Sequence, residues 1–526
     1  MKKLFLLFTF DLLLALTAMA QGNTYKNPVI PGFYPDPSIC RNGDDYYLVT
    51  SSFQFFPGVP VFHSKDLVNW TQVGNCLTRK SQLPLEKVRS SGGIYAPTIR
   101  YNNGTFYMVT TNVSGGGNFY VTTTDPAKEW SEPVWVKQGG IDPTIFFDDN
   151  GEVYFTSTGN RSIVLSKIDI KTGKILSEIK TIWTGTGGRY PEAPHIYKLN
   201  GWYYLMIAEG GTEYGHMETI ARSKSIWGPY ESNPDNPIIT HRTRHGQHSP
   251  IQGTGHADII QAHDNSWWMV FLAFRPVGGN FHHLGRETFL MPIQWNKEGW
   301  PYMNEQDTAS VVNKVPSFYK KKAERQNGKE DFDNSAFQPY WNFLRNPMEA
   351  NYSLTQKPGF LALKGSEVTL NDVASPTFIG RRQQHFKFET NVPLNFENAG
   401  MNDEAGITVF MDEKHHYDLC LTNEDNKFFV VLKYKLGQIN HVEKKVQVST
   451  TKVLLTVKGE PLNYTFSFKE ESSNDGIAMG TVETKFLSSE VAGGFTGVYM
   501  GLYSTGNGKI AKVPAYFDWF DYQPEE

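Results

Sequence analysis

The sequence predicts an all-β protein, a five-bladed β-propeller followed by an antiparallel β-sandwich. Three observations lead to this prediction. A short motif recurs roughly every 50 residues, a period typical of propeller blades, at 34–39, 96–99, 142–145, 193–196 and 256–259. An aromatic-rich apolar run follows each copy, at 46–49, 106–109, 153–156, 202–205 and 267–270. No long stretch has the period of a helix, so few helices are expected.

Each repeat has the signals of a β-hairpin. An Asn-Gly turn separates the motif from the apolar run in four of the repeats, at 42–43, 103–104, 150–151 and 200–201. Asn-Gly between two apolar runs is a strong hairpin signal. The propeller is therefore expected over residues 24–315. The polar, lysine-rich stretch 304–330 is interpreted as a connector between two domains.

The remaining residues, 331–526, are expected to form the antiparallel sandwich. They show short apolar and alternating patterns at the spacing of sandwich strands. The candidate strands are 360–363, 405–410, 417–421, 428–434, 453–457, 464–468, 497–503 and 516–522.

The composition suits two folded β domains. The chain has 526 residues, which is more than one ordinary hydrophobic core contains. Its residues are 39% hydrophobic and 14% aromatic, and this composition argues against disorder. The net charge of −4 gives no reason to expect a nucleic acid or an anionic membrane surface as partner. Three cysteines far apart form neither a disulfide framework nor a metal cluster, so buried thiols are expected.

Residues 1–20 have the pattern of a secretory signal peptide. Lys2 and Lys3 precede an apolar stretch at 4–16, and Ala18-Met19-Ala20 has the small residues of a cleavage site. The alternative is a membrane anchor, but Asp11 interrupts the stretch, which is shorter than the ~20 residues of a membrane span. We expect an exported protein, periplasmic or secreted, with no membrane partner after cleavage.

The repeat motif brings ionisable residues to one place. In a propeller the first strand of each blade lines the central channel. Asp36, Asp142 and His256 share one repeat position, Glu192 lies one residue before it, and Ala96 occupies it in the second blade. An Asp before Pro is alone a common turn starter. Several such residues in a closed ring indicate a functional site, because crowded like charges are unfavourable.

Paired carboxylates in a pocket indicate cleavage of a glycosidic bond. One carboxyl must be protonated to assist the leaving group, and another must be ionised to activate water. A third carboxylate can orient the acid and raise its pKa.

The chain resembles glycoside hydrolase family 43. The segments that carry the resemblance are NPVIPGFYPDPSICRNGDDYYLVTSS, FHSKDLVNW, GGIDPTIFFDD, RYPEAPHIYK and HLGRETFLMPIQW. The later segments EDFDNSAFQPYWNFLRNP and AGITVFMDEKHHYDLCL are similar to the β-sandwich of the β-xylosidase and α-L-arabinofuranosidase branch. The resemblance covers nearly the whole chain after the signal.

This resemblance implies roles for the residues of the matching motifs. The Asp of the DPS motif, Asp36, corresponds to the general base, and the Glu of PEAPH, Glu192, to the general acid. The Asp of the DPT motif, Asp142, corresponds to the residue that orients the acid and modulates its pKa. The family's reaction is inverting. Arg286 of LGRET is expected to bind a sugar hydroxyl, the alternative being a surface ion pair with Glu287.

Further residues match the branch in kind. Phe53 fits an aromatic wall of the terminal sugar pocket, with core packing as the alternative. Tyr95 stands where many relatives have Trp, which leaves the shape of the wall open. His256 matches an axial histidine near the substrate, which in some relatives lies near a cation such as Ca²⁺. No cofactor is required by the reaction itself. Phe495 of the sandwich is a candidate for the pocket rim.

The resulting hypothesis is an exo-acting inverting glycosidase that releases terminal α-L-arabinofuranose, and also β-D-xylose, from hemicellulose such as arabinoxylan or xyloglucan side chains. The wall of Phe55, Phe56 and Tyr95 favours arabinofuranose. The alternatives are a β-xylosidase acting on xylo-oligosaccharides, an endo-arabinanase and a non-catalytic carbohydrate-binding propeller. The expected partner is a pentose-containing carbohydrate, and the oligomeric state stays open.

Overall fold

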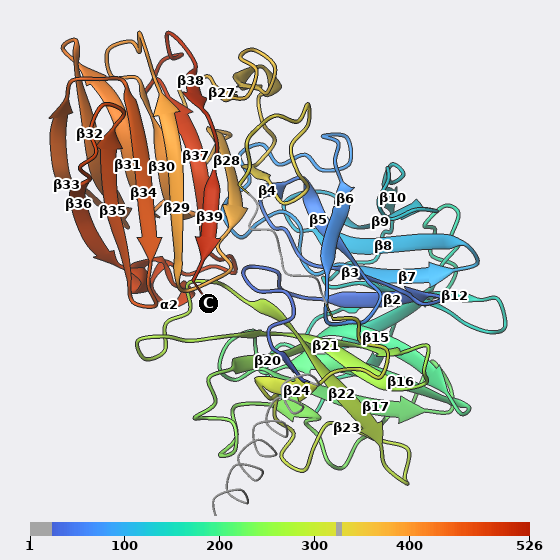
Figure 1. The fold of residues 1–526 in the computed structure, drawn as a ribbon. Helices are drawn as coiled ribbons and strands as arrows, with labels where there is room; N and C mark the ends of the chain where they lie inside the picture. The colour runs from blue at the N-terminus through green and yellow to red at the C-terminus, as the bar shows by residue number, and fades with distance from the viewer. Residues whose placement is uncertain (1–23, 322–328, 526) are drawn as a thin grey trace, which may run out of the picture.

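The computed structural model describes residues 24–321 and 329–525 as two β domains (Figure 1). The predicted all-β fold class, a five-bladed propeller with a C-terminal sandwich, is confirmed. The predicted signal peptide at 1–20 lies outside the described residues. Within the described ranges, no helix combines the length and apolar character needed to cross a membrane. The three cysteines are buried free thiols.

Five antiparallel sheets form the blades of the propeller. Blade 1 contains β2 (Ser38–Asn42), β3 (Asp45–Val49), β5 (Gly58–Ser64) and β6 (Thr71–Leu77). Blade 2 contains β7 (Thr98–Asn102), β8 (Thr105–Asn112), β9 (Gly117–Thr123) and β10 (Val134–Trp135). Blade 3 contains β11 (Thr144–Phe147), β12 (Val153–Thr158), β13 (Ile163–Lys167) and β14 (Lys180–Trp183). Blade 4 contains β15 (Glu192–Leu199), β16 (Trp202–Glu209), β17 (Met217–Ser223) and β18 (Glu231–Ser232), with β19 (Ile239–Thr240) beside β17. Blade 5 contains β20 (Gln252–Gln261), β21 (Trp267–Phe274), β22 (Glu287–Trp295) and β23 (Pro301–Tyr302).

The first strands of the blades form the inner ring. β2 contacts β7, β7 contacts β11, β11 contacts β15, β15 contacts β20, and β20 contacts β2 again. The predicted Asn-Gly turns connect the first two strands in blades 1 to 4. The ring thus places the start of every repeat motif around one axis, as the motif spacing predicts.

The start of the described chain is held on blade 5. β1 (Thr24–Lys26) pairs with β24 (Val312–Lys314), and Ile30 bridges to Thr288 of β22. The side chain of Asn27 donates a hydrogen bond to the carbonyl of Leu290 at 2.8 Å. The stretch 304–330 is therefore not only a connector, because β24 within it finds a partner strand that lies far away in the sequence.

Two sheets pack face to face in the C-terminal domain. The first has the order β33 (Ile439–Val448), β32 (Lys427–Leu436), β31 (His415–Glu424), β30 (Glu404–Asp412), β37 (Tyr499–Thr505), β28 (Thr377–Arg382), β25 (Asn342–Leu344) and β4 (Phe55–Phe56). The second has the order β26 (Tyr352–Ser353), β27 (Leu361–Leu363), β38 (Ala515–Phe517), β29 (Phe388–Asn395), β34 (Lys452–Gly459), β35 (Asn463–Glu470) and β36 (Ile477–Glu483), with β39 (Asp521–Pro524) beside β29. Three short helical turns occur among the described residues of this domain, η1 (Glu349–Asn351), η2 (Thr484–Leu487) and α2 (Ser489–Ala492). Side chains of β29 and β34 alternate between buried and half-buried, as in a sheet with one core face.

The single strand expected at 516–522 is two strands, β38 and β39, which both pair with β29. Residues 518 and 519 between them belong to no strand, and Phe520 forms an isolated bridge with Glu330. A continuous apolar pattern hides this break, because Trp519 and Phe520 look like strand residues in the sequence.

One strand of the propeller segment belongs to the sandwich sheet. β4 pairs with β25, with Phe56 opposite Phe343 and Phe55 opposite Leu344. Phe55 is completely buried and stacks on Tyr499 at 4.0 Å between ring centroids. The expectation that Phe55 and Phe56 form the sugar wall is therefore wrong, since their rings belong to the junction of the two domains.

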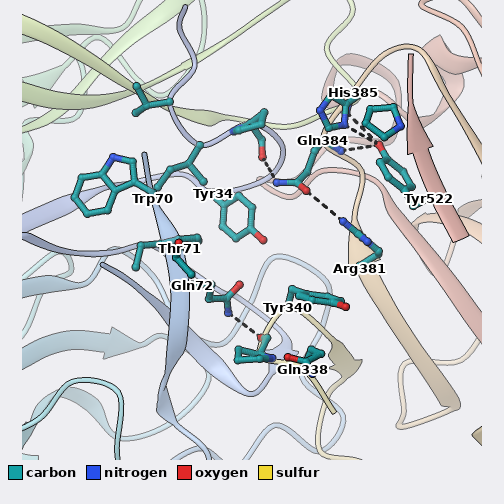
Figure 2. Close-up of a pocket in the computed structure, with 16 residues that line it drawn as sticks. Tyr34, Trp70, Thr71, Gln72, Gln338, Tyr340, Arg381, Gln384, His385 and Tyr522 are labelled. Atoms are coloured by element: carbon teal, nitrogen blue, oxygen red, sulfur yellow. Dashed lines mark hydrogen bonds between the residues drawn. The ribbon is translucent and has the colours of Figure 1, made fainter. Parts of the chain in front are cut away.

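A second contact between the domains encloses a cavity of about 430 Å³ (Figure 2). Arg381 donates to Gln384 at 3.4 Å, and the Gln384 amide donates to the Pro31 carbonyl at 3.2 Å. On the other side, Gln72 of β6 donates to the Pro339 carbonyl at 2.8 Å. None of the candidate site residues lines this cavity. Hydrogen bonds donated by these glutamine side chains therefore connect the propeller to the sandwich segment.

Candidate active site

The repeat motif has an unusual backbone. Asp36, Asp142, Ala193 and His256 have φ angles of 56°, 53°, 54° and 51°, in the left-handed region. This region is uncommon for residues other than glycine, and the first three of these residues also precede a proline, which favours an extended backbone. Strained conformations of this kind concentrate at functional sites. The same turn thus occurs at the inner ring in four blades.

The four predicted ionisable residues meet at this ring. The His256 Nδ1 atom lies 3.7 Å from Asp36 Oδ1. Ligand atoms of Asp142, Glu192 and His256 all lie within 4.8 Å of one another. The predicted convergence of blades 1, 3, 4 and 5 is present in the structure.

Asp36 is surrounded by groups that favour its ionised form. The Ser51 hydroxyl donates a short hydrogen bond to its Oδ2 atom, and Arg286 Nη1 donates to Oδ1 at 3.1 Å. Burial alone would raise the pKa of Asp36, but the Arg286 charge, His256 and the Ser51 bond outweigh it. The pKa of Asp36 therefore lies below the usual range, and its carboxylate is ionised at neutral pH.

Glu192 and Asp142 have the opposite environment. Burial, together with the charge of Asp36, raises the pKa of Glu192 to about 7, although Arg286 acts to lower it. Burial and the charges of Glu192 and Asp36 raise the pKa of Asp142 well above its usual range, against a hydrogen bond from the Ala193 backbone. The two carboxyls are close and compete for a proton, so at least one of them is protonated at neutral pH.

His256 is held at the centre of the ring in its neutral form. Burial is the main cause that lowers its pKa, although Asp36 acts to raise it. The buried Glu218 carboxyl group accepts a hydrogen bond from the Ala257 backbone at 3.0 Å, which fixes the strand beside His256. Two carboxyls that compete for a proton and one imidazole do not fit Ca²⁺, which takes about six to eight oxygen ligands. We therefore derive no step through a metal ion.

Arg286 is buried beside the carboxylates. Its Nη1 atom also donates to Thr212 Oγ1 at 2.7 Å, and Nη2 donates to the Phe495 carbonyl at 3.1 Å. Glu287 pairs with Arg275 at 2.7 Å instead. The alternative of a surface ion pair between Arg286 and Glu287 is thus wrong. Three N–H donors of Arg286 are used, and the rest of the guanidinium can bind a hydroxyl group.

An aromatic group borders the guanidinium. Phe53 is 2% exposed, and its ring centroid lies 5.4 Å from that of Tyr95 and 6.1 Å from that of Phe495. The Arg286 guanidinium lies 5.9 Å from the Phe53 ring and 5.6 Å from the Phe495 ring. Phe53 therefore packs in the core while its ring contacts the half-buried Tyr95. Phe495 brings the sandwich to the site, and its backbone N–H donates to Ser91 Oγ at 2.8 Å.

Sequence reasoning missed residues that hold these groups in position. Thr212 lies in the loop 210–216, where a side chain on Gly210 would clash with the Gly215 carbonyl. This cluster of three glycines at 210, 211 and 215 was the available signal. The buried Glu209 accepts backbone hydrogen bonds from Thr186 and Gly188 at 2.9 Å each, which fixes the segment before Glu192. No sequence pattern marks Ser51 or Glu209.

Comparisons with known proteins agree with this architecture. Residues 25–301 match the model of glycosyl hydrolases family 43, and 329–523 match the beta xylosidase C-terminal concanavalin A-like domain. The chain is 43% identical to a non-reducing end alpha-L-arabinofuranosidase of Bacteroides ovatus, over 98% of both chains. It is 38% identical to a xylosidase/arabinosidase of Butyrivibrio fibrisolvens, over 94% of this chain and 98% of the relative. A solved structure described as Bacteroides ovatus xyloglucan PUL GH43B superposes with a TM-score of 0.92 at 43% identity, over 95% of this chain and 100% of that one.

Proposed function

The chain belongs to glycosyl hydrolase family 43, and from this premise we propose that it is an exo-acting, inverting glycosidase that releases terminal α-L-arabinofuranose from hemicellulose. In this proposal Asp36 is the general base, Glu192 the general acid and Asp142 the residue that orients the acid and modulates its pKa. Arg286, Tyr95 and His256 bind the terminal sugar, and the buried Phe53 supports the Tyr95 ring from the core side.

The opposite pKa shifts of Asp36 and Glu192 carry this proposal. A pair of carboxyl groups whose environments move their pKa values apart is the signature of an acid and a base. The ionised Asp36 can accept a proton from water, and Glu192, with a pKa of about 7, can donate one near neutral pH. Arg286 stabilises the charge on Asp36, whereas it acts to lower the pKa of Glu192, which burial and the charge of Asp36 raise.

The reaction follows from this assignment. Asp36 removes a proton from water as the water oxygen forms a bond to the anomeric carbon. The bond from that carbon to the leaving oxygen breaks, and Glu192 gives its proton to this oxygen. The base gains one proton and the acid loses one, and exchange with solvent restores both. Direct attack by water inverts the anomeric configuration.

The sandwich domain supports exo action. The Phe495 carbonyl accepts a hydrogen bond from Arg286, and its N–H is fixed by Ser91 of the propeller. This segment lies against the guanidinium at the site, where an open cleft for a continuous polymer would require free space. A pocket of this kind suits a chain end. A series of oligomeric products from arabinan would instead support an endo-arabinanase.

The preference for arabinofuranose rests on the relatives, because Phe55 and Phe56 do not form the wall. The Bacteroides ovatus relative is named an arabinofuranosidase, and the Butyrivibrio relative is named for both sugars. Hydrolysis of 4-nitrophenyl α-L-arabinofuranoside and 4-nitrophenyl β-D-xyloside tests the preference. We expect higher kcat/KM on the arabinofuranoside, and a large preference for the xyloside would favour the β-xylosidase alternative.

The natural substrate and the stereochemistry are tested on oligosaccharides. We expect free arabinose as the only small product from arabinoxylan or xyloglucan side chains, and proton NMR at early times should show the inverted anomer. Binding without any release of sugar would favour a non-catalytic carbohydrate-binding propeller. We further propose that the protein is exported with cleavage after residue 20, which N-terminal sequencing of the mature protein tests.

A further inference from the structure

A cavity of about 500 Å³ lies outside the carboxylate ring, between the propeller and the sandwich. Glu192, Arg286 and Phe495 form its inner end. We call its outer part the outer chamber, defined by Tyr190, Glu213, Tyr214, Phe274, His282 and Glu490. Blades 4 and 5 supply the first five of these residues, and α2 of the sandwich supplies Glu490.

The position of the outer chamber relative to the two catalytic candidates indicates what it holds. Glu192 lines the cavity, whereas Asp36 and Asp142 do not. In an inverting glycosidase the base and the acid act from opposite faces of the terminal sugar, and the acid touches the leaving oxygen. The space that adjoins the acid but not the base is therefore on the leaving-group side.

Tyr190 has an unusual position at the mouth of the chamber. It is 62% exposed, has a φ of 51° and lies two residues before Glu192. Arg189 holds the segment: its carbonyl accepts from Gly210 N–H at 2.7 Å, and its Nη2 donates to the Gly210 carbonyl at 3.0 Å. The guanidinium also lies 5.6 Å from the Tyr190 ring. The chain thus fixes a strained backbone that presents an aromatic ring to solvent.

The two carboxylates of the chamber have partners within the chain. Glu213 forms an ion pair with Arg189. Glu490 accepts from the His282 imidazole at 2.6 Å and from the His282 N–H at 3.0 Å. Both carboxylates therefore have partners inside the chain, and neither is left to attract a cation. A neutral ligand fits such a lining better than an ionic one.

The remaining walls of the chamber are aromatic. His282 stacks on Phe274 at 4.0 Å, and Tyr214 meets Phe274 edge to face at 5.0 Å. The Tyr214 hydroxyl donates to the Asn280 carbonyl at 3.0 Å, which fixes the ring. Rigid aromatic walls with a few polar groups are typical of ligand pockets, which have volumes of roughly 300–1,000 Å³. The cavity of about 500 Å³ has room for more than one sugar ring.

We propose that the outer chamber is a leaving-group site for a neutral oligosaccharide of two or more sugar units, and that Tyr190 determines this specificity by stacking on a sugar ring. This inference rests on the proposed function, because it takes Glu192 as the acid. It predicts that the enzyme prefers a pentose attached to an oligosaccharide over one attached to a small leaving group.

The test compares two substrates that differ in the leaving group. One is xylotriose with an α-L-arabinofuranosyl substituent, and the other is α-L-arabinofuranosyl azide, whose leaving group is too small to reach Tyr190. The quantity measured is the ratio of kcat/KM for the two. We expect Tyr190→Ala to reduce this ratio about tenfold, a loss typical of an aromatic contact, and Tyr190→Phe to restore it.

Tyr302 provides a matched control, because it is also exposed, at 37%, and lies on β23 away from the chamber lining. Tyr302→Ala should leave the ratio unchanged. An unchanged ratio in Tyr190→Ala, or equal losses on both substrates, would overturn the proposal. If the wild type hydrolyses neither substrate, the proposed function fails. Calorimetry with xylotriose then decides about the chamber: binding that Tyr190→Ala abolishes supports it, and absence of binding by the wild type refutes it.

Discussion

The hydroxyl of Ser51 offers a direct test of how the site keeps Asp36 ionised. Ser51 is completely buried and donates to the Asp36 carboxylate, but it does not line the cavity. Ser51→Ala removes one group that favours the charged form, so the pKa of Asp36 must rise. Hydrogen bonds to charged groups contribute about 1.5–3 kcal/mol, and about 1.4 kcal/mol corresponds to one pKa unit. Since Arg286 and His256 remain, we expect a rise of about one unit.

This rise has a defined effect on the pH profile. The acidic limb of kcat/KM reports the pKa of the base in the free enzyme. In Ser51→Ala the limb should move to higher pH by about one unit, while the plateau near pH 6 stays close to that of the wild type. The assay is hydrolysis of the preferred nitrophenyl pentoside between about pH 2.5 and 7, a range that includes the wild-type acidic limb, since the pKa of Asp36 lies below its usual value of about 3.9. A depressed carboxyl pKa stabilises the fold above the unfolded pKa, and this contribution is lost as pH falls. Because Ser51→Ala raises the pKa of Asp36, it should lower the free energy of unfolding at neutral pH.

Ser52 is the control for this experiment. It is buried next to Ser51, and its hydroxyl has no hydrogen-bond partner among the residues described. Ser52→Ala should therefore leave the acidic limb in place. An acidic limb that does not move in Ser51→Ala would refute the reasoning, and a uniform loss at all pH values would show that Ser51 acts on geometry instead.

Three further predictions test the acid, the metal and the domain junction. Glu192→Gln should reduce kcat by roughly 10²–10⁴-fold and keep sugar binding in calorimetry. In the wild type, kcat/KM should decline above pH 7, where Glu192 loses its proton. Activity of Glu192→Gln near the wild-type level would show that Glu192 is not the acid. Dialysis against EDTA should leave kcat/KM unchanged, and a loss restored by Ca²⁺ would contradict the poor fit of the site to a cation. Arg345 donates to the Val88 carbonyl of the propeller and pairs with the buried Glu413 of the sandwich. Arg345→Met leaves Glu413 without its charged partner and should cost roughly 3–5 kcal/mol of unfolding free energy, measured by denaturant titration. The exposed pair Lys80–Glu86 is its control, because Lys80→Met should cost less than about 1 kcal/mol.

The features that the sequence predicts well are those with a local or periodic signal. The Asn-Gly turns and the recurring motif each span a few residues. The number of motif copies, five, predicts a ring of five blades. The meeting of Asp36, Asp142 and Glu192 needs no contact information beyond this ring. The predicted site therefore follows from the period of the motif.

Contacts between distant segments could not be predicted in the same way. Phe55 and Phe56 form a strand only because β25 pairs with them almost 290 residues later, and an apolar pair looks the same in a sugar wall. β33 was missed because it is an exposed edge strand rich in lysine, with the sequence INHVEKKVQV. Ser51 and Thr212 were missed because their roles depend on where Asp36 and Arg286 lie.

The fourth blade shows how a structural repeat separates an acid from a base. In blades 1 and 3 the left-handed residue before the proline is itself the carboxylate, Asp36 or Asp142, and both are buried. In blade 4 Ala193 takes the left-handed position, and the carboxylate is Glu192, one residue earlier and one methylene longer. Glu192 is only half-buried and, unlike the other two, lines the cavity that leads to the outer chamber. A shift of one residue within the same turn is therefore sufficient to give one carboxyl access to a leaving group, while Asp36 stays with Arg286 and Ser51 as a charged base.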